Sequence, residues 1–314
     1  MTAAVTTLAD GTMTAGAMST QFLRFAQGLA EELVTAAEAS RGWQSSEMSD
    51  AIQSFRKRAK LLRATLAVLA QGVDRPICEG ALEILGEANR LLSPLRDHDV
   101  LRRSIRWTGE LFEEPEQRSV RTVLSAALLL ESKRGACDGL IDDRAFEDAV
   151  LSRVMTASHQ IRTAVAAISG HGVRRRAIAS SIEAKWKQAR RNLNAAIVAR
   201  DAAALHAVRK DLVEVSGCLD AWGGGAEVNE RCARFMRLLA RVARKLGEDR
   251  DFAMLSDRCV LQRDRFACQS LYTAIVSAIT MRRKELFRSI RRDARRLRAY
   301  RRTDLRTMLR EGLS

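Results

Sequence analysis

Breaks in helical sequence are scarce in this chain. Its 314 residues contain three prolines, Pro76, Pro94 and Pro115, and 18 glycines. Proline and glycine end helices and form turns, so their scarcity favours long helices over a turn-rich sheet protein. Alanine, leucine, arginine and glutamate are plentiful, and all four are compatible with helix.

Apolar residues recur at helical spacing along nearly the whole chain, and no alternating strand pattern is convincing. The sequence therefore predicts an all-α fold. The predicted helices cover residues 20–40, 48–71, 77–111, 115–133, 144–168, 174–199, 201–222, 227–257 and 261–310, the last with an internal break.

Two landmarks recur along the chain at nearly one offset. Residues 53–63 read QSFRKRAKLLR, and residues 206–216 read HAVRKDLVEVS. Arg209 follows Arg56 by 153 positions, and Arg250 follows Arg96 by 154. A constant offset between separate landmarks indicates duplication of a helical unit. We expect one domain over 20–312, with halves at about 20–168 and 174–312.

The N-terminal residues and the cysteines bear on location. Residues 1–19 lack a basic start and a long apolar stretch, which predicts a disordered tail and not a signal peptide. The longest apolar run, residues 126–130, is far too short to span a bilayer. None of the six cysteines has zinc-ligand spacing, so we expect small buried side chains in a reducing, cytoplasmic compartment.

The positive charge is concentrated near the C-terminus. The chain carries a net charge of +15, and residues 282–310 contain thirteen Arg or Lys against three acids. An excess of this size indicates a polyanionic partner: polyphosphate, nucleic acid or an anionic membrane surface.

A stripe of cations runs beside the predicted core face of the helix at 48–71. Arg56, Lys60 and Arg63 stand at i, i+4 and i+7, roughly a right angle from the face that carries Phe55 and Leu62. Cations stacked so closely repel one another unless an anion lies across them. The stripe favours anion binding; a solvated face neutralised by acids of another helix is the alternative.

The equivalent helix of the second half keeps only part of this stripe. It carries His206, Arg209 and Lys210, whereas Val213 and Ser216 stand where the first stripe has its second and third cations. A histidine beside an arginine suits hydrogen bonding to phosphate, and a structural role is the alternative. We therefore expect the two halves to contribute unequally to anion affinity, with the larger contribution from the first half.

The last predicted helix carries the densest cationic face. Arginine presents planar, bidentate donors that match phosphate oxygens, so this face predicts anion binding. The cations within about 60° of one direction on a helical wheel are Lys284, Arg288, Arg291, Arg292, Arg295, Arg302 and Arg306.

No group of residues typical of an enzyme stands out. The sequence shows no convincing Ser-His-Asp arrangement, no glycine-rich phosphate loop and no metal-ligand spacing. We therefore expect no catalytic residue, no metal and no cofactor. A phosphoryl-hydrolysing enzyme is the less expected alternative, and its candidate carboxylates are Asp97, Asp99, Glu248 and Asp251.

In their order and spacing, these motifs resemble the conserved histidine α-helical domain (CHAD) family. That family repeats a helix with His, then Arg three positions on, followed by a helix with a Leu-Gly-x-x-Arg-Asp-like motif. Here the first copy is 53–63 with 95–100, and the second is 205–210 with 246–251. Residues 185–191 look like the family's basic aromatic helix, and the chain from 282 onward looks like its C-terminal basic helix. The resemblance covers roughly 20–310.

The resemblance implies two pseudosymmetric antiparallel helical bundles with a basic groove between them, and non-catalytic binding of inorganic polyphosphate. Together with the stripes, it predicts the polyphosphate-binding residues Arg56, Lys60, Arg63, Arg96, Lys187, Arg190, His206, Arg209, Lys210, Arg282, Arg283, Arg288, Arg291, Arg292 and Arg295. The chain departs from the family pattern at Gln53, which stands where the first histidine is expected.

Nucleic acid is the main alternative partner, because it also offers regularly spaced phosphates. Aromatic residues make up only 5% of the chain and no base-reading motif is recognisable, which disfavours it. Association with polyphosphate granules is compatible with polyphosphate binding.

Overall fold

The chain is helical throughout the part that the computed structural model describes. The described residues are 15–39, 45–71, 74–114, 116–134, 143–169, 174–223, 230–266 and 268–311. Over these ranges the protein forms eleven α-helices and one short 3-10 turn, with no strand. The predicted all-α class is confirmed.

The elements follow one another in a simple order. The first half contains α1 (Ala15–Ala39), α2 (Ser45–Leu69), α3 (Arg75–Leu91), α4 (Ser93–Gly109), α5 (Glu116–Arg134) and α6 (Asp143–Ala166). The second half contains α7 (Arg175–Ala199), α8 (Ala202–Gly223), α9 (Glu230–Leu261), the 3-10 turn Arg263–Arg265, α10 (Gln269–Ala299) and α11 (Arg302–Glu311).

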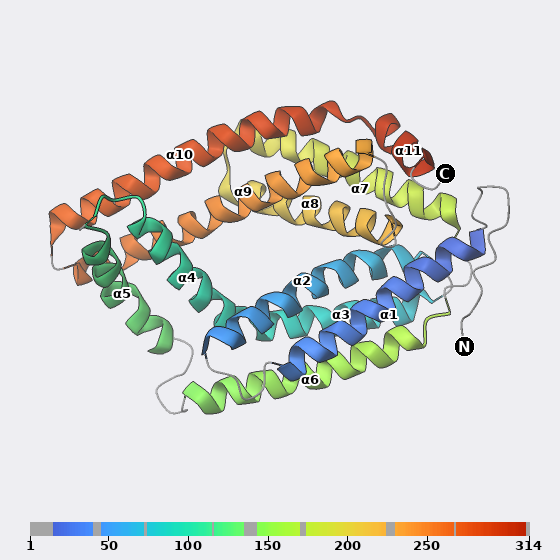
Figure 1. The fold of residues 1–314 in the computed structure, drawn as a ribbon, viewed down its shortest axis with the longest axis horizontal. Helices are drawn as coiled ribbons and strands as arrows, with labels where there is room; N and C mark the ends of the chain where they lie inside the picture. The colour runs from blue at the N-terminus through green and yellow to red at the C-terminus, as the bar shows by residue number, and fades with distance from the viewer. Residues whose placement is uncertain are drawn as a thin grey trace.

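The helices form an elongated molecule with two long sides. Figure 1 shows α7, α8, α9 and α10 along one side and α1, α2, α3 and α6 along the other, with α4 and α5 joining them at one end. Helix α1 begins at Ala15, five residues before the predicted domain start, and residues 1–14 of the predicted tail lie outside the described residues.

One predicted helix proves to be interrupted, and the break expected in another is located. The single helix expected over 77–111 divides at Leu92 into α3 and α4. Pro94 accounts for this break, because proline has no N–H to donate to the preceding helix and is tolerated in the first turn of the next one, where it lies in α4. The region 261–310 contains α10 and α11, separated at Tyr300 and Arg301, so the cationic face predicted to run on to Arg306 does not lie on one helix.

A large core unites both long sides of the molecule. Its biggest fully buried side chains include Phe22 from α1, Phe55 from α2, Trp186 from α7 and Phe235 from α9. Burying a side chain of this size stabilises the fold by roughly 1.5–3 kcal/mol. A second, smaller cluster holds α4 and α5 against the end of α9 and the start of α10, around Phe252 and neighbouring aliphatic residues. The two clusters fix α2, α4, α8 and α9 relative to one another.

Helices α2 and α8 pack closely at Ala64 and Gly217. A Cβ atom added to Gly217 would stand 2.9 Å from the Cβ of Ala64, so only glycine permits this approach. The next residue, Cys218, directs its thiol sulfur at the carbonyl oxygen of Ala64, 3.6 Å away. Ala64 and Gly217 are themselves separated by the repeat offset of 153. Contact between equivalent positions is expected where two related halves meet about a pseudo-twofold axis.

None of the described helices is long and apolar enough to cross a membrane.

Candidate functional site

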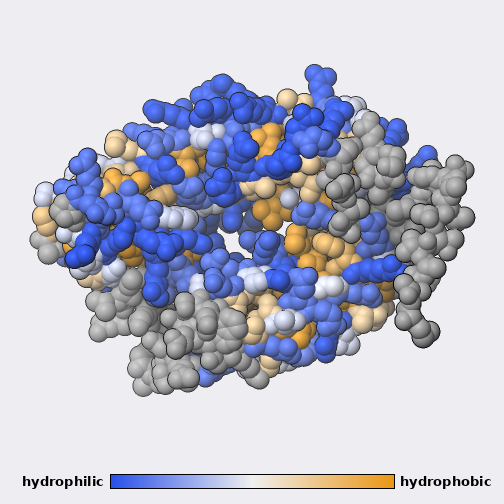
Figure 2. Space-filling model, in the orientation of Figure 1, coloured by the Kyte–Doolittle hydropathy of each residue, from blue (hydrophilic) through white to orange (hydrophobic). Residues whose placement is uncertain are grey.

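A cavity of about 430 Å³ lies between the two long sides, and we call it the central pocket. Helices α2 and α4 contribute its lining from the first half, and α8 and α9 from the second. Figure 2 shows an opening through the middle of the molecule, with hydrophilic residues around its rim. The charged residues that line the central pocket are Arg56, Lys57, Lys60, Arg96, Arg103, Arg209 and Arg244, with Asp99, Asp220 and Asp251.

Helix α2 places two of the predicted stripe cations in the pocket. Phe55 and Leu62 are buried in the core, which leaves Arg56 and Lys60 on the adjacent face, at the pocket. The guanidinium of Arg56 donates a hydrogen bond to the backbone oxygen of Asn89 on α3 (3.1 Å), which fixes its position. The third stripe residue, Arg63, is exposed and does not line the pocket.

Burial and mutual repulsion raise the energy of these charges. Burial first, and then Arg209 and Arg56, lower the pKa of Lys60 to about 8. Burial and Arg96 lower the pKa of Arg56 to about 10, against a partly compensating effect of Asp97. A lowered pKa means that the protein leaves the positive charge poorly compensated. An anion in the pocket would supply the missing compensation.

Helix α4 contributes two further arginines on one face. Arg96 pairs with Asp97 at 3.3 Å, which holds its guanidinium in place. Arg103, seven residues on and therefore on the same face, stacks over the ring of Trp107 at 5.4 Å. Its Nε atom is buried without a hydrogen-bond partner among the described residues. Arg103 was not predicted, although its spacing from Arg96 was the available signal.

Helix α8 places Arg209 against a glycine of α9. A Cβ added to Gly247 would stand 2.9 Å from the Nε of Arg209, so the glycine makes room for the guanidinium. This is a physical reason for the glycine in the 246–251 motif. Burial lowers the pKa of Arg209, although Asp251 acts in the opposite direction. The buried Nε of Arg209 has no hydrogen-bond partner within the described part of the chain.

His206 lies one turn before Arg209 and is uncharged at neutral pH. Burial, followed by Arg250 and Lys210, lowers its pKa to about 4. Its Nδ1 atom is buried and finds no hydrogen-bond partner in the described ranges. Neither His206 nor Lys210 is among the residues lining the pocket, but the charge of Arg96 still acts on His206 across the space between the halves. The histidine is therefore a neutral donor close to the pocket.

The central pocket retains a clear positive excess. Seven cations and three carboxylates line it, which leaves a formal charge of +4. Burial raises the pKa of Asp220 and of Asp251, whereas the neighbouring cations act to lower it. Val213 and Ser216 also line the pocket, at the positions equivalent to Lys60 and Arg63. The second half thus presents fewer cations there than the first.

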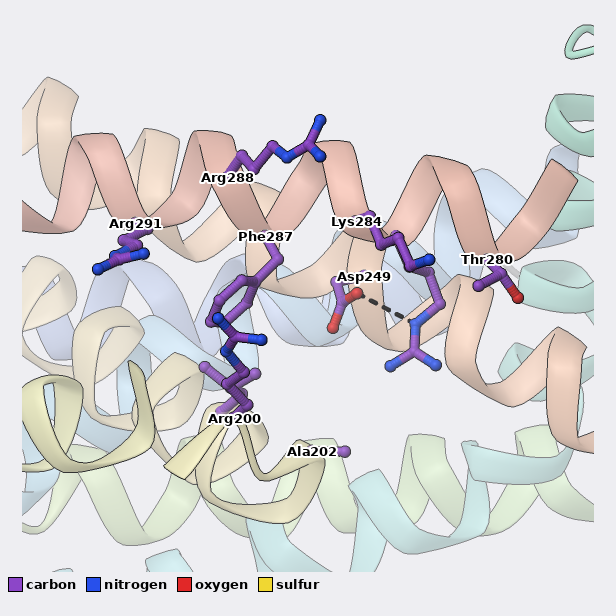
Figure 3. A pocket seen from close by; sticks show the side chains of 10 residues that line it. Arg200, Ala202, Asp249, Thr280, Lys284, Phe287, Arg288 and Arg291 are labelled. Carbon is purple, nitrogen blue, oxygen red and sulfur yellow. Dashed lines mark hydrogen bonds and ion pairs between the residues drawn. The ribbon is translucent and has the colours of Figure 1, made fainter. Parts of the chain in front are cut away.

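Three of the predicted cations of α10 lie at a second cavity, of about 520 Å³, which we call the α10 pocket. Arg283, Arg288 and Arg291 line it together with Lys284 from the same helix and Arg200 from the α7–α8 connection (Figure 3). The two pockets share no lining residue.

Three other predicted residues of α10 line neither pocket. Arg282 pairs with Glu248 at 2.7 Å and with Glu285 at 3.5 Å, whereas Arg292 and Arg295 are exposed. The structure therefore does not bring all predicted cations of this helix to one place.

The predicted cations of α7 also lie away from both pockets. Arg190 donates from Nε to the backbone oxygen of Arg298 at 2.8 Å, which ties α7 to the end of α10, and Lys187 is exposed.

Arg302 and Arg306, expected on the cationic face, both pair with Glu183, whose side chain is only 4% exposed. These pairs anchor α11 on α7.

Three further cations that line the pockets were not predicted: Lys57, Arg244 and Arg200. Arg244 lines the central pocket from α9, seven residues before Asp251 and so on the same face. Arg200 lines the α10 pocket from a helix end, where helical spacing gives no signal.

The described residues contain no group of three or more potential metal ligands.

The family model described as CHAD domain matches residues 27–260, which is most of the chain. The chain belongs to the CHAD domain family. The matched CHAD region includes the four helices that line the central pocket and ends before α10. No curated protein matches the chain.

Proposed function

We propose that this CHAD protein binds inorganic polyphosphate in the central pocket and does not hydrolyse it. The observation that carries the proposal is the set of closely spaced cations contributed by both halves. Seven cations meet three carboxylates there, and burial together with mutual repulsion lowers the pKa of Lys60 and of Arg56. A linear polyanion relieves this repulsion at several positions at once, which a single small anion does not.

The lining favours polyphosphate over nucleic acid. Proteins that bind single strands combine cations with aromatic rings on which the bases stack. No aromatic side chain lines the central pocket among the described residues. Its side chains thus offer partners for phosphate oxygens but no platform for bases.

The same lining supports a non-catalytic role. Hydrolysis of phosphoanhydrides commonly uses carboxylates that hold divalent metal ions. Here Asp251 lies among Arg96, Arg103 and Arg209, whose charges act on it directly. The surrounding arginines repel cations, so Asp251 is poorly placed to hold a metal ion.

Competition at fixed salt tests the proposal. The protein is loaded with a labelled long-chain polyphosphate and titrated with single-stranded RNA or duplex DNA matched in phosphate concentration. We expect nucleic acid to displace the label poorly and the recovered polyphosphate to keep its length. Efficient displacement would identify nucleic acid as the ligand, and release of orthophosphate would identify an enzyme.

A further inference from the structure

The α10 pocket has a different chemistry from the central pocket. Helix α10 supplies Arg283, Lys284, Arg288 and Arg291, and the α7–α8 connection supplies Arg200. One carboxylate, Asp249, lines it and is engaged by the Nε of Arg283 at 3.2 Å (Figure 3). The cations outside this pair leave a formal charge of +4, which calls for a ligand with several negative charges.

The pocket also contains an arginine stacked on an aromatic ring. The guanidinium of Arg200 lies over the ring of Phe287 at 5.5 Å, as Figure 3 shows. Arg200 is exposed, so one face of its guanidinium remains open to a ligand. Ala202 and Leu205 add apolar surface beside the stack. Planar rings stack well on arginine, whereas inorganic phosphate gains nothing from apolar surface.

The backbone of Arg200 is a second, independent indication of a binding role. Its φ of 54° and ψ of 26° put it in the left-handed region, the only described non-glycine residue with positive φ. Glycine is the preferred residue at such a helix end, because a side chain there costs energy. The presence of an arginine in this conformation is explained if its guanidinium, held above Phe287, takes part in ligand binding.

The volume agrees with a ligand larger than one phosphate. A cavity of about 520 Å³ falls within the roughly 300–1,000 Å³ of pockets that hold ligands of drug size. We propose that the α10 pocket binds a nucleoside triphosphate. The base stacks on the Arg200–Phe287 pair, and side chains of α10, led by Lys284 and Arg291, contact the phosphates. This is a separate site from the central pocket and does not depend on polyphosphate binding there.

Calorimetry on the full chain tests the proposal with two probes, adenosine triphosphate and inorganic tripolyphosphate. They share a triphosphate group, but only the nucleotide has a planar ring. Stacking of a base is worth about 1–3 kcal/mol, so the nucleotide should bind at least about fivefold more tightly. Equal affinity for both probes would overturn the proposal and assign the pocket to inorganic oligophosphate.

Two substitutions separate this pocket from the central pocket, because Phe287 and Arg200 line the first and not the second. Phe287→Leu removes the ring without changing charge, so nucleotide affinity should fall to that of tripolyphosphate while tripolyphosphate affinity stays unchanged. Arg200→Gly should weaken both probes, and the thermal midpoint should not decrease because glycine suits the left-handed conformation. Loss of both probes on Phe287→Leu would show that the ring only supports the helix, and would overturn the stacking role.

A matched control measures the effect of overall charge. Arg296→Ala with Arg301→Ala removes two exposed cations that line neither pocket. We expect both affinities to stay within about twofold, since screened charges outside the pocket contribute little. If the control weakens the nucleotide as much as Arg200→Gly, binding is diffuse and the proposal is wrong. Long-chain polyphosphate, titrated in parallel, reports separately on the central pocket.

Discussion

Lys60 should couple polyphosphate binding to protonation. In the free protein, burial and the neighbouring arginines lower its pKa to about 8. A bound polyanion favours the charged form and should return the pKa towards the usual 10.5. Binding should therefore take up about 0.5 proton at pH 8 and close to one proton near pH 9.

The direction of the pH effect follows from this shift. Affinity is full below about pH 7, where Lys60 is already charged, and falls as pH rises because binding must then protonate it. With the two pKa values above, the loss between pH 7 and pH 9 is about tenfold. Arg56, with a pKa of about 10, adds little in this range. His206, with a pKa of about 4, contributes only at lower pH unless binding raises its pKa above 7.

Calorimetry in two buffers with different ionisation enthalpies measures the proton uptake directly. Long chains are the suitable ligand, because only their terminal phosphates titrate near neutral pH. Lys60→Met keeps much of the apolar stem and removes the charge, so uptake near pH 9 should disappear and the affinity should no longer depend on pH between 7 and 9. Equal proton uptake in the wild type and the variant would refute the reasoning.

The same variant should be more stable than the wild type without ligand. Lys60 is charged at pH 7, but the folded protein stabilises this charge less well than water stabilises it in the unfolded chain, at a cost of up to about 3 kcal/mol. Because the unfolded chain binds more protons between pH 8 and 10.5, wild-type stability should rise over this range. Denaturant unfolding of Lys60→Met at pH 7 should show a higher free energy of unfolding, and a lower value would contradict the pKa shift.

Three further predictions follow from particular contacts. Gly247→Ala should leave the free energy of unfolding unchanged or raise it by up to about 1 kcal/mol. The same substitution should weaken polyphosphate binding, because the added Cβ displaces Arg209. Unchanged binding in calorimetry would show that Arg209 tolerates the shift. Glu183→Gln should cost about 1–3 kcal/mol in denaturant unfolding, since two half-exposed arginines lose their carboxylate, and polyphosphate affinity should not change. In a salt titration, the logarithm of polyphosphate affinity should fall with the logarithm of salt concentration at a slope of about −3 to −5. This range assumes about four to seven phosphate contacts that behave as in single-stranded nucleic acids. A slope near zero would exclude an ionic site.

Most of the helical architecture could be read from the sequence. Apolar periodicity placed α2, α5 and α8 within a few residues, because a helix that packs on a core must repeat its apolar face. The break at Leu92 was missed, since the flanking segments continue one helical pattern and only Pro94 marks the change of direction. The break before Arg302 was expected somewhere in the region, but its place was not.

The site was predictable only in part, for a physical reason. Arg56, Lys60, Arg96 and Arg209 were predicted and line the central pocket, because each stands on a recognisable helical face or motif. Periodicity within one helix does not reveal which helix faces it across the molecule. Lys187 and Arg190, on an outer helix, therefore looked similar to residues at the pocket, and Arg244 was overlooked.

Ion pairing between distant segments was equally hidden in the sequence. Arg302 and Arg306 belong to a run of cations that looks unpaired, yet both meet Glu183, more than a hundred residues away. Arg282 likewise meets Glu248 from a different helix. Such pairs form only when tertiary packing brings the helices together, so a count of cations in one segment overstates the free charge.

The most direct test of the central claim is the affinity of long-chain polyphosphate for a variant of the central pocket. Lys60→Ala with Arg209→Ala removes one cation from each half. Arg24→Ala with Arg176→Ala is the matched control, because it removes two exposed cations that line neither pocket. Hydrogen bonds to charged groups contribute roughly 1.5–3 kcal/mol each, so the pocket variant should bind about a hundredfold or more weakly at low salt. The control should bind almost as the wild type does, and circular dichroism should show equal helicity in all three proteins. Equal affinities of the pocket variant and the control would contradict the assignment of polyphosphate to the central pocket.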